Sequence, residues 1–294
     1  MKIIVRQKAS YKKYKNKTFQ ELMNHSLVLL NKEKGVSSRN FTRFLLDLGF
    51  NKAGHAGTLD PNTTGVLPIL LNRGNKISSI LSLSKKEYIA TMIVHKDFTK
   101  DMIESTFKSF TGEIDQLVPK ISAVKRQVRK RNIYSIKLIS INNRLVKFKV
   151  LCQAGTYIRK LIHDMGESME TGAHMIELER TKSGPFKLNE CLSKDKFIKL
   201  FNKKNINCFR PLEDAVKDIN KVWIDDGAII PWSKGSPIYF KGILKFTSDI
   251  KLNSKIAVFN TSNELIGIGI SKSNSDDFLN KDEGIAFRNY INLI

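Results

Sequence analysis

Cysteine is scarce in this sequence, with only Cys152, Cys191 and Cys208 among 294 residues. The three lie far apart and form no Cys-x-x-Cys pair, so neither a disulfide framework nor a zinc knuckle is indicated. Long apolar stretches are missing as well, since no run approaches the ~18 residues of a membrane span. The basic N-terminus is not followed by the apolar segment of a signal peptide. We therefore expect a soluble cytoplasmic protein with reduced cysteines and no membrane partner.

Acidic residues are also few in this sequence. The chain has 28 Asp and Glu against 50 Lys and Arg, a net charge of +22. Residues 221–294 hold nine basic and eight acidic residues, so residues 1–220 carry all but one of the excess positive charges. No acid occurs from Gln116 to His163, and none precedes Glu21. Charge runs are usually solvated faces, but runs this long without a counter-charge favour phosphate contacts and a polyanionic partner.

Helical and extended patterns alternate over residues 1–210. In "SSRNFTRFLLDLGF", we expect Ser38 to cap a helix that ends near Gly49. "YSIKLISI" and "LVKFKVLC" predict a basic hairpin that turns at Asn142 and Asn143. In "AGTYIRKLIHDMGESM", an apolar stripe predicts a helix with Arg159 near its start and off the apolar line. The residues of that stripe are Ile158, Leu161, Ile162 and Met165.

The composition changes between Pro211 and Lys221. Short extended segments with turn residues follow, among them "KVWI", "KIAVFN" and "ELIGIGI". They predict a small β-rich domain of about 75 residues behind an α/β or α+β body with a cleft.

The stretch "GHAGTLDPNTTGVLP", residues 54–68, surrounds Asp60 with glycines and follows it with Pro61. Glycine allows positive φ and close approach of the backbone to a ligand, which favours a binding loop around a functional carboxylate. Asp followed by Pro is equally typical of a helix start, with the aspartate as N-cap. Both interpretations stay open on this stretch alone, and His55 can equally be an ordinary loop histidine.

Five ordered motifs resemble the pseudouridine synthases that include bacterial tRNA pseudouridine synthase B and the dyskerin branch. They are residues 54–68, "KKEYIATM" at 85–92, "ISAVKRQVRKRNIY" at 121–134, "GTYIRKLIHDMGE" at 155–167 and "GAHMIELERTKSGPF" at 172–186. "TGVLP" and "GTYIRKL" are closest to the archaeal dyskerin-like enzymes, the catalytic subunits of H/ACA particles. The resemblance runs from about Leu27 to the end of the chain.

This resemblance implies an α+β pseudouridine synthase fold, with a mixed, largely antiparallel sheet and flanking helices around a central cleft. It places the catalytic domain at residues 1–215, with a basic N-terminal arm at 1–25. A small β-barrel PUA domain is expected at 216–294, where it would bind RNA.

The implied reaction detaches a uracil base from its ribose in RNA, turns it and rejoins it through carbon five. The resemblance assigns Asp60 as the essential carboxylate, attacking the sugar of a flipped uridine or taking a proton from it, with Arg159 as its partner. It assigns Tyr88 to stack on the target base, where its phenol could also help remove the proton from carbon five. Four further positions match residues that line the pocket or touch RNA: Lys32, His55, Lys86 and Leu178. No redox step occurs, so no cofactor and no metal is expected.

Several positions depart from the family pattern. Asn31, Glu33, Ser37 and Arg39 replace the aspartate, proline, threonine and histidine of a motif near the start, and Glu179 replaces an arginine. These differences affect the expected RNA contacts at the edge of the cleft, while the catalytic positions are intact.

Family members work in two ways, which sets the expected partners. In the first, they modify ribosomal RNA with an H/ACA guide RNA, together with a zinc-ribbon-like, a small β-barrel and a kink-turn-binding protein. In the second, they modify uridine 55 of the tRNA T-loop without a guide. A catalytically silent RNA-binding scaffold of the same fold is the alternative, which the joint presence of Asp60, Tyr88 and Arg159 disfavours. A hydrolytic N-glycosidase would need a second carboxylate to activate water, and the motifs contain none.

Overall fold

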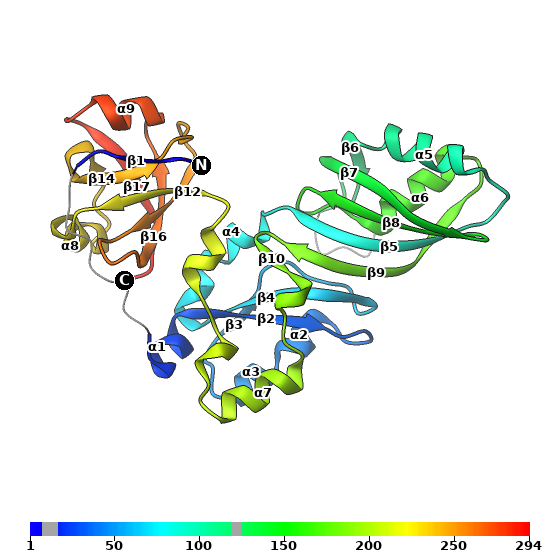
Figure 1. Ribbon diagram of the computed structural model, residues 1–294, viewed down its shortest axis with the longest axis horizontal. Helices are drawn as coiled ribbons and strands as arrows, with labels where there is room; N and C mark the ends of the chain where they lie inside the picture. The colour runs from blue at the N-terminus through cyan, green and yellow to red at the C-terminus, as the bar shows by residue number, and fades with distance from the viewer. Residues whose placement is uncertain (8–16, 119–124) are drawn as a thin grey trace.

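The computed structural model describes residues 1–7, 17–118 and 125–294. Residues 8–16 of the predicted basic arm and the first four residues of the motif at 121–134 lie outside these ranges. Two β-sheets organise the described chain, one of ten strands and one of seven, with helices packed on each (Figure 1). The expected α+β class is confirmed.

The ten-stranded sheet has the order β11-β2-β4-β9-β5-β8-β7-β6, with β10 paired to β9 and β3 paired to β4. Its strands are β2 (Ser26–Lys32), β3 (Ala53–His55), β4 (Thr63–Leu71), β5 (Lys86–Val94), β6 (Gly112–Leu117), β7 (Val128–Asn142), β8 (Leu145–Cys152), β9 (Ala173–Ser183), β10 (Phe186–Lys187) and β11 (Arg210–Pro211). All neighbours on this path are antiparallel except β4 and β9, which are parallel and pair only Thr63–Gly65 with Leu178–Arg180. We call this short parallel contact the seam, because it is where the two halves of the sheet meet.

Helices cover the sheet on either side of the seam. They are α1 (Phe19–Asn24), α2 (Ser38–Thr42), α3 (Phe44–Asp47), α4 (Ser78–Ser82), α5 (Lys100–Ser109), α6 (Ile158–Ser168) and α7 (Lys194–Asn202), with short 3-10 turns at Asn72–Ile77, Leu188–Glu190, Ile206–Cys208 and Leu212–Val216. In Figure 1, α5 and α6 lie over the half formed by β5 to β9, and α2, α3 and α7 lie beside β2 to β4. On β5 the buried residues Tyr88, Ala90 and Met92 alternate with less buried ones, so this strand presents its apolar face to α6.

The hairpin and the arginine helix predicted from the sequence are confirmed. β7 and β8 pair antiparallel around a turn in which Asn143 has a φ of +50°. Helix α6 buries its predicted apolar stripe and carries Arg159 as its second residue.

The predicted capping residue of the helix after residue 37 is wrong by one position. Ser37 is the N-cap of α2, and its hydroxyl accepts a hydrogen bond from the Asn40 amide. The hydroxyl of Ser38 is buried instead, where it bonds both the amide and the carbonyl of Leu59 at 2.8 and 2.9 Å. Either serine can cap locally, so the long-range contact with Leu59 decides between them.

The seven-stranded sheet has the order β1-β14-β12-β15-β16-β17-β13. Its elements are β1 (Ile3–Val5), β12 (Asn220–Ile224), β13 (Ile238–Tyr239), β14 (Ile243–Thr247), β15 (Lys255–Phe259), β16 (Leu265–Ser271) and β17 (Ile285–Asn292), with α8 (Ile229–Ser233), α9 (Ser275–Asn280) and 3-10 turns at Asp226–Ala228 and Phe240–Gly242. Its core is aromatic and aliphatic and includes Trp232, Phe246, Phe278 and Phe287.

The first residues of the chain pack on this second sheet. β1 pairs with β14, and the Arg6 guanidinium donates to the carbonyls of Phe278 and Lys281 and pairs with Asp282 at 2.6 Å. The two sheets also share a hydrophobic cluster, in which Leu27 and Leu212 meet Trp223 and Leu265. The chain therefore folds as two sheets joined through packed side chains.

Among the residues with described positions, no helix is both long and apolar enough to cross a membrane, and no three His, Cys, Asp or Glu side chains gather as a metal site.

Candidate active site

Asp60 lies directly before β4, at the seam. Its carboxylate Oδ2 is 2.9 Å from Nη2 of Arg159, which the first turn of α6 presents from the other half of the sheet. Both side chains are open to solvent, since that of Asp60 is 57% exposed and that of Arg159 is 60% exposed. The pair lies at the surface, where a bound molecule can reach it.

The loop that carries Asp60 is a turn and not a helix start. The Asp60 carbonyl accepts the amide of Thr63 at 3.0 Å, and β4 begins at Thr63. The alternative in which Asp60 caps a helix is therefore wrong. The Pro61 carbonyl accepts hydrogen bonds from Gly35 and from Lys32 Nζ, which fixes the turn against β2.

The glycines around Asp60 make room for the protein itself. Gly65 has a φ of +107°, and a side-chain carbon there would lie 2.3 Å from the Arg180 carbonyl oxygen across the seam. At Gly54 such a carbon would lie 2.2 Å from the Asn75 side chain. Gly54 and Gly65 are therefore required by close packing of the protein's own backbone and side chains.

Tyr88 lies on β5 and is 9% exposed. Burial raises the pKa of its phenol, while the positive charge of Arg180, its register partner on β9, acts in the opposite direction. Because the raised pKa keeps the phenol protonated near neutral pH, this state does not favour the suggested role of Tyr88 in removing a proton from carbon five.

Lys86 is directed inward, not toward a ligand. Its ammonium donates to the carbonyls of Leu81 and Ser84 at 2.9 and 2.7 Å and to the Ser84 hydroxyl at 3.0 Å. Burial, followed by the charge of Arg180, lowers the Lys86 pKa to about 7. Its expected role in touching RNA is therefore not supported by this geometry.

Lys32 and His55 lie next to the loop that carries Asp60. Lys32 is fully buried and donates to the carbonyls of Glu33 and Pro61 at 2.7 and 3.1 Å; burial lowers its pKa, and the negative charge of Asp60 opposes that shift. His55 is half-buried on β3, and burial followed by the charge of Arg180 lowers its pKa. Its Nδ1 has no hydrogen-bond partner among the described residues.

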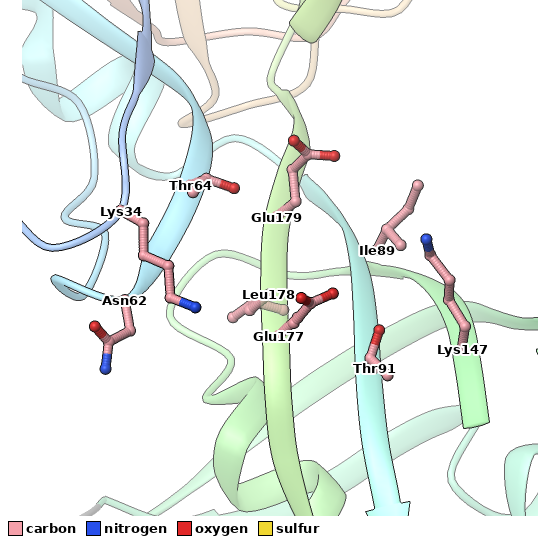
Figure 2. Close-up of a pocket in the computed structure, with 9 residues that line it drawn as sticks. All are labelled: Lys34, Asn62, Thr64, Ile89, Thr91, Lys147, Glu177, Leu178 and Glu179. Carbon is pink, nitrogen blue, oxygen red and sulfur yellow. The ribbon is translucent and has the colours of Figure 1, made fainter. Parts of the chain in front are cut away.

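Leu178 lies at the seam and lines an open pocket of about 210 Å³ (Figure 2). The other lining residues are Lys34, Asn62, Thr64, Ile89, Thr91, Lys147, Glu177 and Glu179. Asp60, Tyr88 and Arg159 do not line it. The residues Ile89 and Thr91 alternate on β5 with Tyr88 and Ala90, so this pocket opens mainly on the opposite face of the strand.

The departures from the family pattern lie mostly at the surface. Asn31, Glu33 and Arg39 are exposed, and Ser37 serves as the N-cap described above. Glu179 lines the pocket in Figure 2.

Sequence reasoning missed Arg180. This residue is 1% exposed on β9, pairs in register with Tyr88, and donates from its guanidinium to the carbonyls of Val66 and Gly57 at 2.8 and 3.0 Å. The available signal was its place in "LERTKSG", two residues after Leu178 and so on the same face of a strand.

Comparison with known proteins agrees with this geometry. Residues 45–158 match the N-terminal domain of the TruB family of pseudouridylate synthases, residues 159–217 match a tRNA pseudouridylate synthase B C-terminal domain, and residues 220–289 match a PUA domain. A probable tRNA pseudouridine synthase B from Nanoarchaeum equitans is 38% identical over 92% of this chain and 80% of its own length. A second, from Thermococcus onnurineus, is 39% identical over 90% of this chain and 82% of its own length.

Solved structures extend the similarity to the whole fold. A chain in the crystal structure of a Cbf5-Nop10-Gar1 complex superposes with a TM-score of 0.93 at 32% identity, covering 100% of this chain and 94% of that one. A chain of an H/ACA ribonucleoprotein bound to a substrate RNA containing 2'-deoxyuridine gives a TM-score of 0.91 at 30% identity, with the same coverage. With an arginine-paired aspartate at the seam and a PUA domain behind it, this chain belongs to the TruB family of pseudouridylate synthases.

Proposed function

We propose that this protein isomerises uridine to pseudouridine in RNA, with Asp60 as the carboxylate that acts on the ribose of a flipped uridine. The observation that carries the proposal is the Asp60–Arg159 pair, 2.9 Å apart at the seam and open to solvent. The two residues are 99 positions apart in the chain, so this contact exists only because the fold brings α6 to the Asp60 loop.

The chemistry suits a lone carboxylate. Cleavage of the glycosidic bond leaves an electron-poor sugar, and the uracil keeps the electron pair of the broken bond. A carboxylate can add to that sugar or take a proton from it, and the base can then rejoin through carbon five as the carboxylate is released and a proton leaves that carbon. Arg159 holds the carboxylate in one orientation, which is the contribution that positioning makes to a reaction of this kind.

Water must be kept out of the reaction, since it would convert isomerisation into hydrolysis. Asp60 is more than half exposed in the free protein, so the RNA itself has to supply the cover. A uridine flipped out of its stack and seated over Asp60 would do so, with the exposed edge of Tyr88 beside the base.

RNA binding follows from the charge distribution. The excess positive charge lies almost entirely in residues 1–220, which suits backbone contacts around the site. The nearly neutral PUA region would recognise a short element, the ACA end of a guide RNA or the CCA end of a tRNA, by shape and base contacts.

The partners are proposed from two kinds of relative. The structural neighbours come from complexes with Nop10, Gar1 and H/ACA RNA, which supports assembly with a zinc-ribbon-like, a small β-barrel and a kink-turn-binding protein on ribosomal RNA. The curated relatives are named as probable tRNA enzymes, which supports unguided action on the T-loop uridine. We expect cytoplasmic RNA in both cases.

One experiment separates these possibilities. Purified protein is incubated with a T-loop tRNA transcript, and separately with a guide RNA, its target and the three partner proteins, and pseudouridine is mapped by carbodiimide block. Product on either substrate supports the synthase and identifies its mode. Tight RNA binding without product on either substrate identifies a silent scaffold, and an abasic site in place of pseudouridine identifies a hydrolase.

A further inference from the structure

Arg180 joins three parts of the site that are distant in sequence. From β9, its Nε donates to the Val66 carbonyl on β4 at 2.8 Å, and its Nη2 donates to the Gly57 carbonyl in the Asp60 loop at 3.0 Å. Tyr88 on β5 is the register partner of Arg180, and the Arg180 charge acts to lower the pKa of the Tyr88 phenol, against the larger effect of burial. Arg180 therefore links the loop and β4, on one side of the seam, to β5 on the other.

The charge of Arg180 has no acidic partner among the residues with described positions. No carboxylate there forms an ion pair with Arg180 or with Lys86. Arg180 and Lys86 both lie next to Gly57. A side-chain carbon on Gly57 would be 3.6 Å from Arg180 Nη1 and 3.7 Å from Lys86 Cε. A buried charge of this kind costs stability, and an apolar side chain would fill the space at lower cost. Stability therefore does not explain this arginine.

We infer that Arg180 is a positioning residue for the proposed isomerisation, which holds the Tyr88 ring and the Asp60 loop in a fixed relation across the seam. The inference rests on the function proposed above. Strand pairing at the seam is limited to three residues on each strand, so Arg180 adds polar contacts to the hydrophobic core that the two halves share. Displacement of about 1 Å between reacting groups can cost ~100-fold in rate.

The decisive variant is Arg180→Lys, because a lysine keeps the charge but replaces the planar fork by a single nitrogen. We expect the single-turnover rate of pseudouridine formation at saturating enzyme to fall about 100-fold, with the Kd for RNA within threefold of wild type. Arg6→Lys is the matched control. Arg6 is also buried and also donates to two carbonyls, those of Phe278 and Lys281, but in the seven-stranded sheet. Its rate should stay within threefold. Equal rates for the two variants would overturn the inference.

A double-mutant cycle tests whether Arg180 acts through the phenol. Tyr88→Phe removes the hydroxyl and keeps the ring. If the two groups act together, Arg180→Lys will lower the rate less in the Tyr88→Phe background than in wild type, whereas Arg6→Lys will have the same effect in both. Full additivity of Arg180→Lys and Tyr88→Phe would show that the arginine does not act through Tyr88.

Hydrogen exchange in the free protein tests whether Arg180 holds the Asp60 loop, and it needs no activity assay. Amides of residues 54–66 should exchange about tenfold faster in Arg180→Lys and at the wild-type rate in Arg6→Lys. If Arg180→Lys does not fold, Tyr88→Phe alone should raise exchange of the same segment about threefold. Unchanged exchange would overturn the inference even in an active enzyme. A wild-type protein that makes no pseudouridine would overturn the proposed function, while the exchange data would still decide the role of Arg180.

Discussion

The two sheets of this protein bury very different side chains. In the ten-stranded region, three charged residues are buried, namely Lys32, Lys86 and Arg180, and all three support or neighbour the Asp60 loop. In residues 216–294, no charged residue is buried, and the buried polar residues are Thr247, Thr261 and Ser271. The second region has the core of a domain built for packing, whereas the first places costly cations where the reaction is proposed to occur.

The two regions also differ in net charge. Residues 1–220 carry almost all of the excess positive charge, while residues 221–294 are nearly balanced. Inside and outside, the ten-stranded region is therefore the more basic of the two, which suits the proposed RNA substrate. Each of the following experiments changes a residue in one region and a matched residue in the other region, or at a remote position of the same region.

The largest effect is expected for Asp60→Asn, which keeps the shape and removes the charge. Pseudouridine formation should fall at least about 1000-fold, while the Kd for RNA stays within a fewfold. Asp282→Asn is the control, because Asp282 is also an exposed aspartate paired with an arginine, Arg6, but on the seven-stranded sheet. Substantial turnover by purified Asp60→Asn would refute the assignment of the catalytic carboxylate.

A smaller loss is expected for Arg159→Lys, which should lower the single-turnover rate about 30- to 100-fold because lysine does not hold the carboxylate in the same orientation. Arg144→Lys provides a matched ion pair, since Arg144 lies 3.0 Å from Asp97 at a distant turn of the same sheet. Its rate should match wild type. Equal losses in both variants would mean that any surface ion pair of this region has the same effect.

The charge difference predicts an intermediate effect on RNA affinity. Replacing Lys125, Arg126 and Lys137 by Gln should weaken binding roughly tenfold at about 0.15 M salt and reduce the salt slope by about 2. The control replaces Lys241, Lys251 and Lys272, which are exposed on residues 216–294. Filter binding over a salt series measures both. A slope that changes equally in the two triple variants would show that the RNA footprint does not follow the charge.

The smallest effect concerns the pH dependence of stability. The Lys86 pKa is about 7 in the folded protein against a usual 10.5, so between these values the unfolded chain binds more protons. The free energy of unfolding of wild type should therefore rise relative to Lys86→Met as pH increases from 7, by up to about 1.4 kcal/mol per pH unit. Urea denaturation at pH 7, 8 and 9 measures it. The control is Lys137→Met, at an exposed position, for which the difference from wild type should not change with pH. If the free energies of unfolding of wild type and Lys86→Met instead run parallel over pH, the Lys86 ammonium lies in solvent.

Local patterns predicted much of the fold. Alternation of Val146, Phe148 and Val150 with lysines predicted β8, and helical spacing predicted α6, because each pattern reports burial of one face. The helix cap was placed one residue late, because Ser37 and Ser38 are equivalent until the contact with Leu59 is known.

The candidate site could not be assembled in the same way. The contact of Asp60 with Arg159 depends on the seam, and neither composition nor spacing indicates which strands meet there; family resemblance supplied that pair. The inward direction of Lys86 depends on carbonyl groups of the turn just before β5, and the junction made by Arg180 depends on a carbonyl 123 positions away. Such backbone acceptors have no signature in the side-chain sequence, so neither arrangement could be predicted from it.

The pairing of β1 with β14 has a consequence for the order of folding. Ile3–Val5 leaves the ribosome about 240 residues before its partner Ile243–Thr247, which at ~5–20 residues per second is a delay of roughly 12 to 50 seconds. During that interval the ten-stranded sheet can form, but the segment at the beginning of the chain has no native neighbour. Completion of the second sheet is thus a late step, which cannot precede synthesis of Ile243–Thr247.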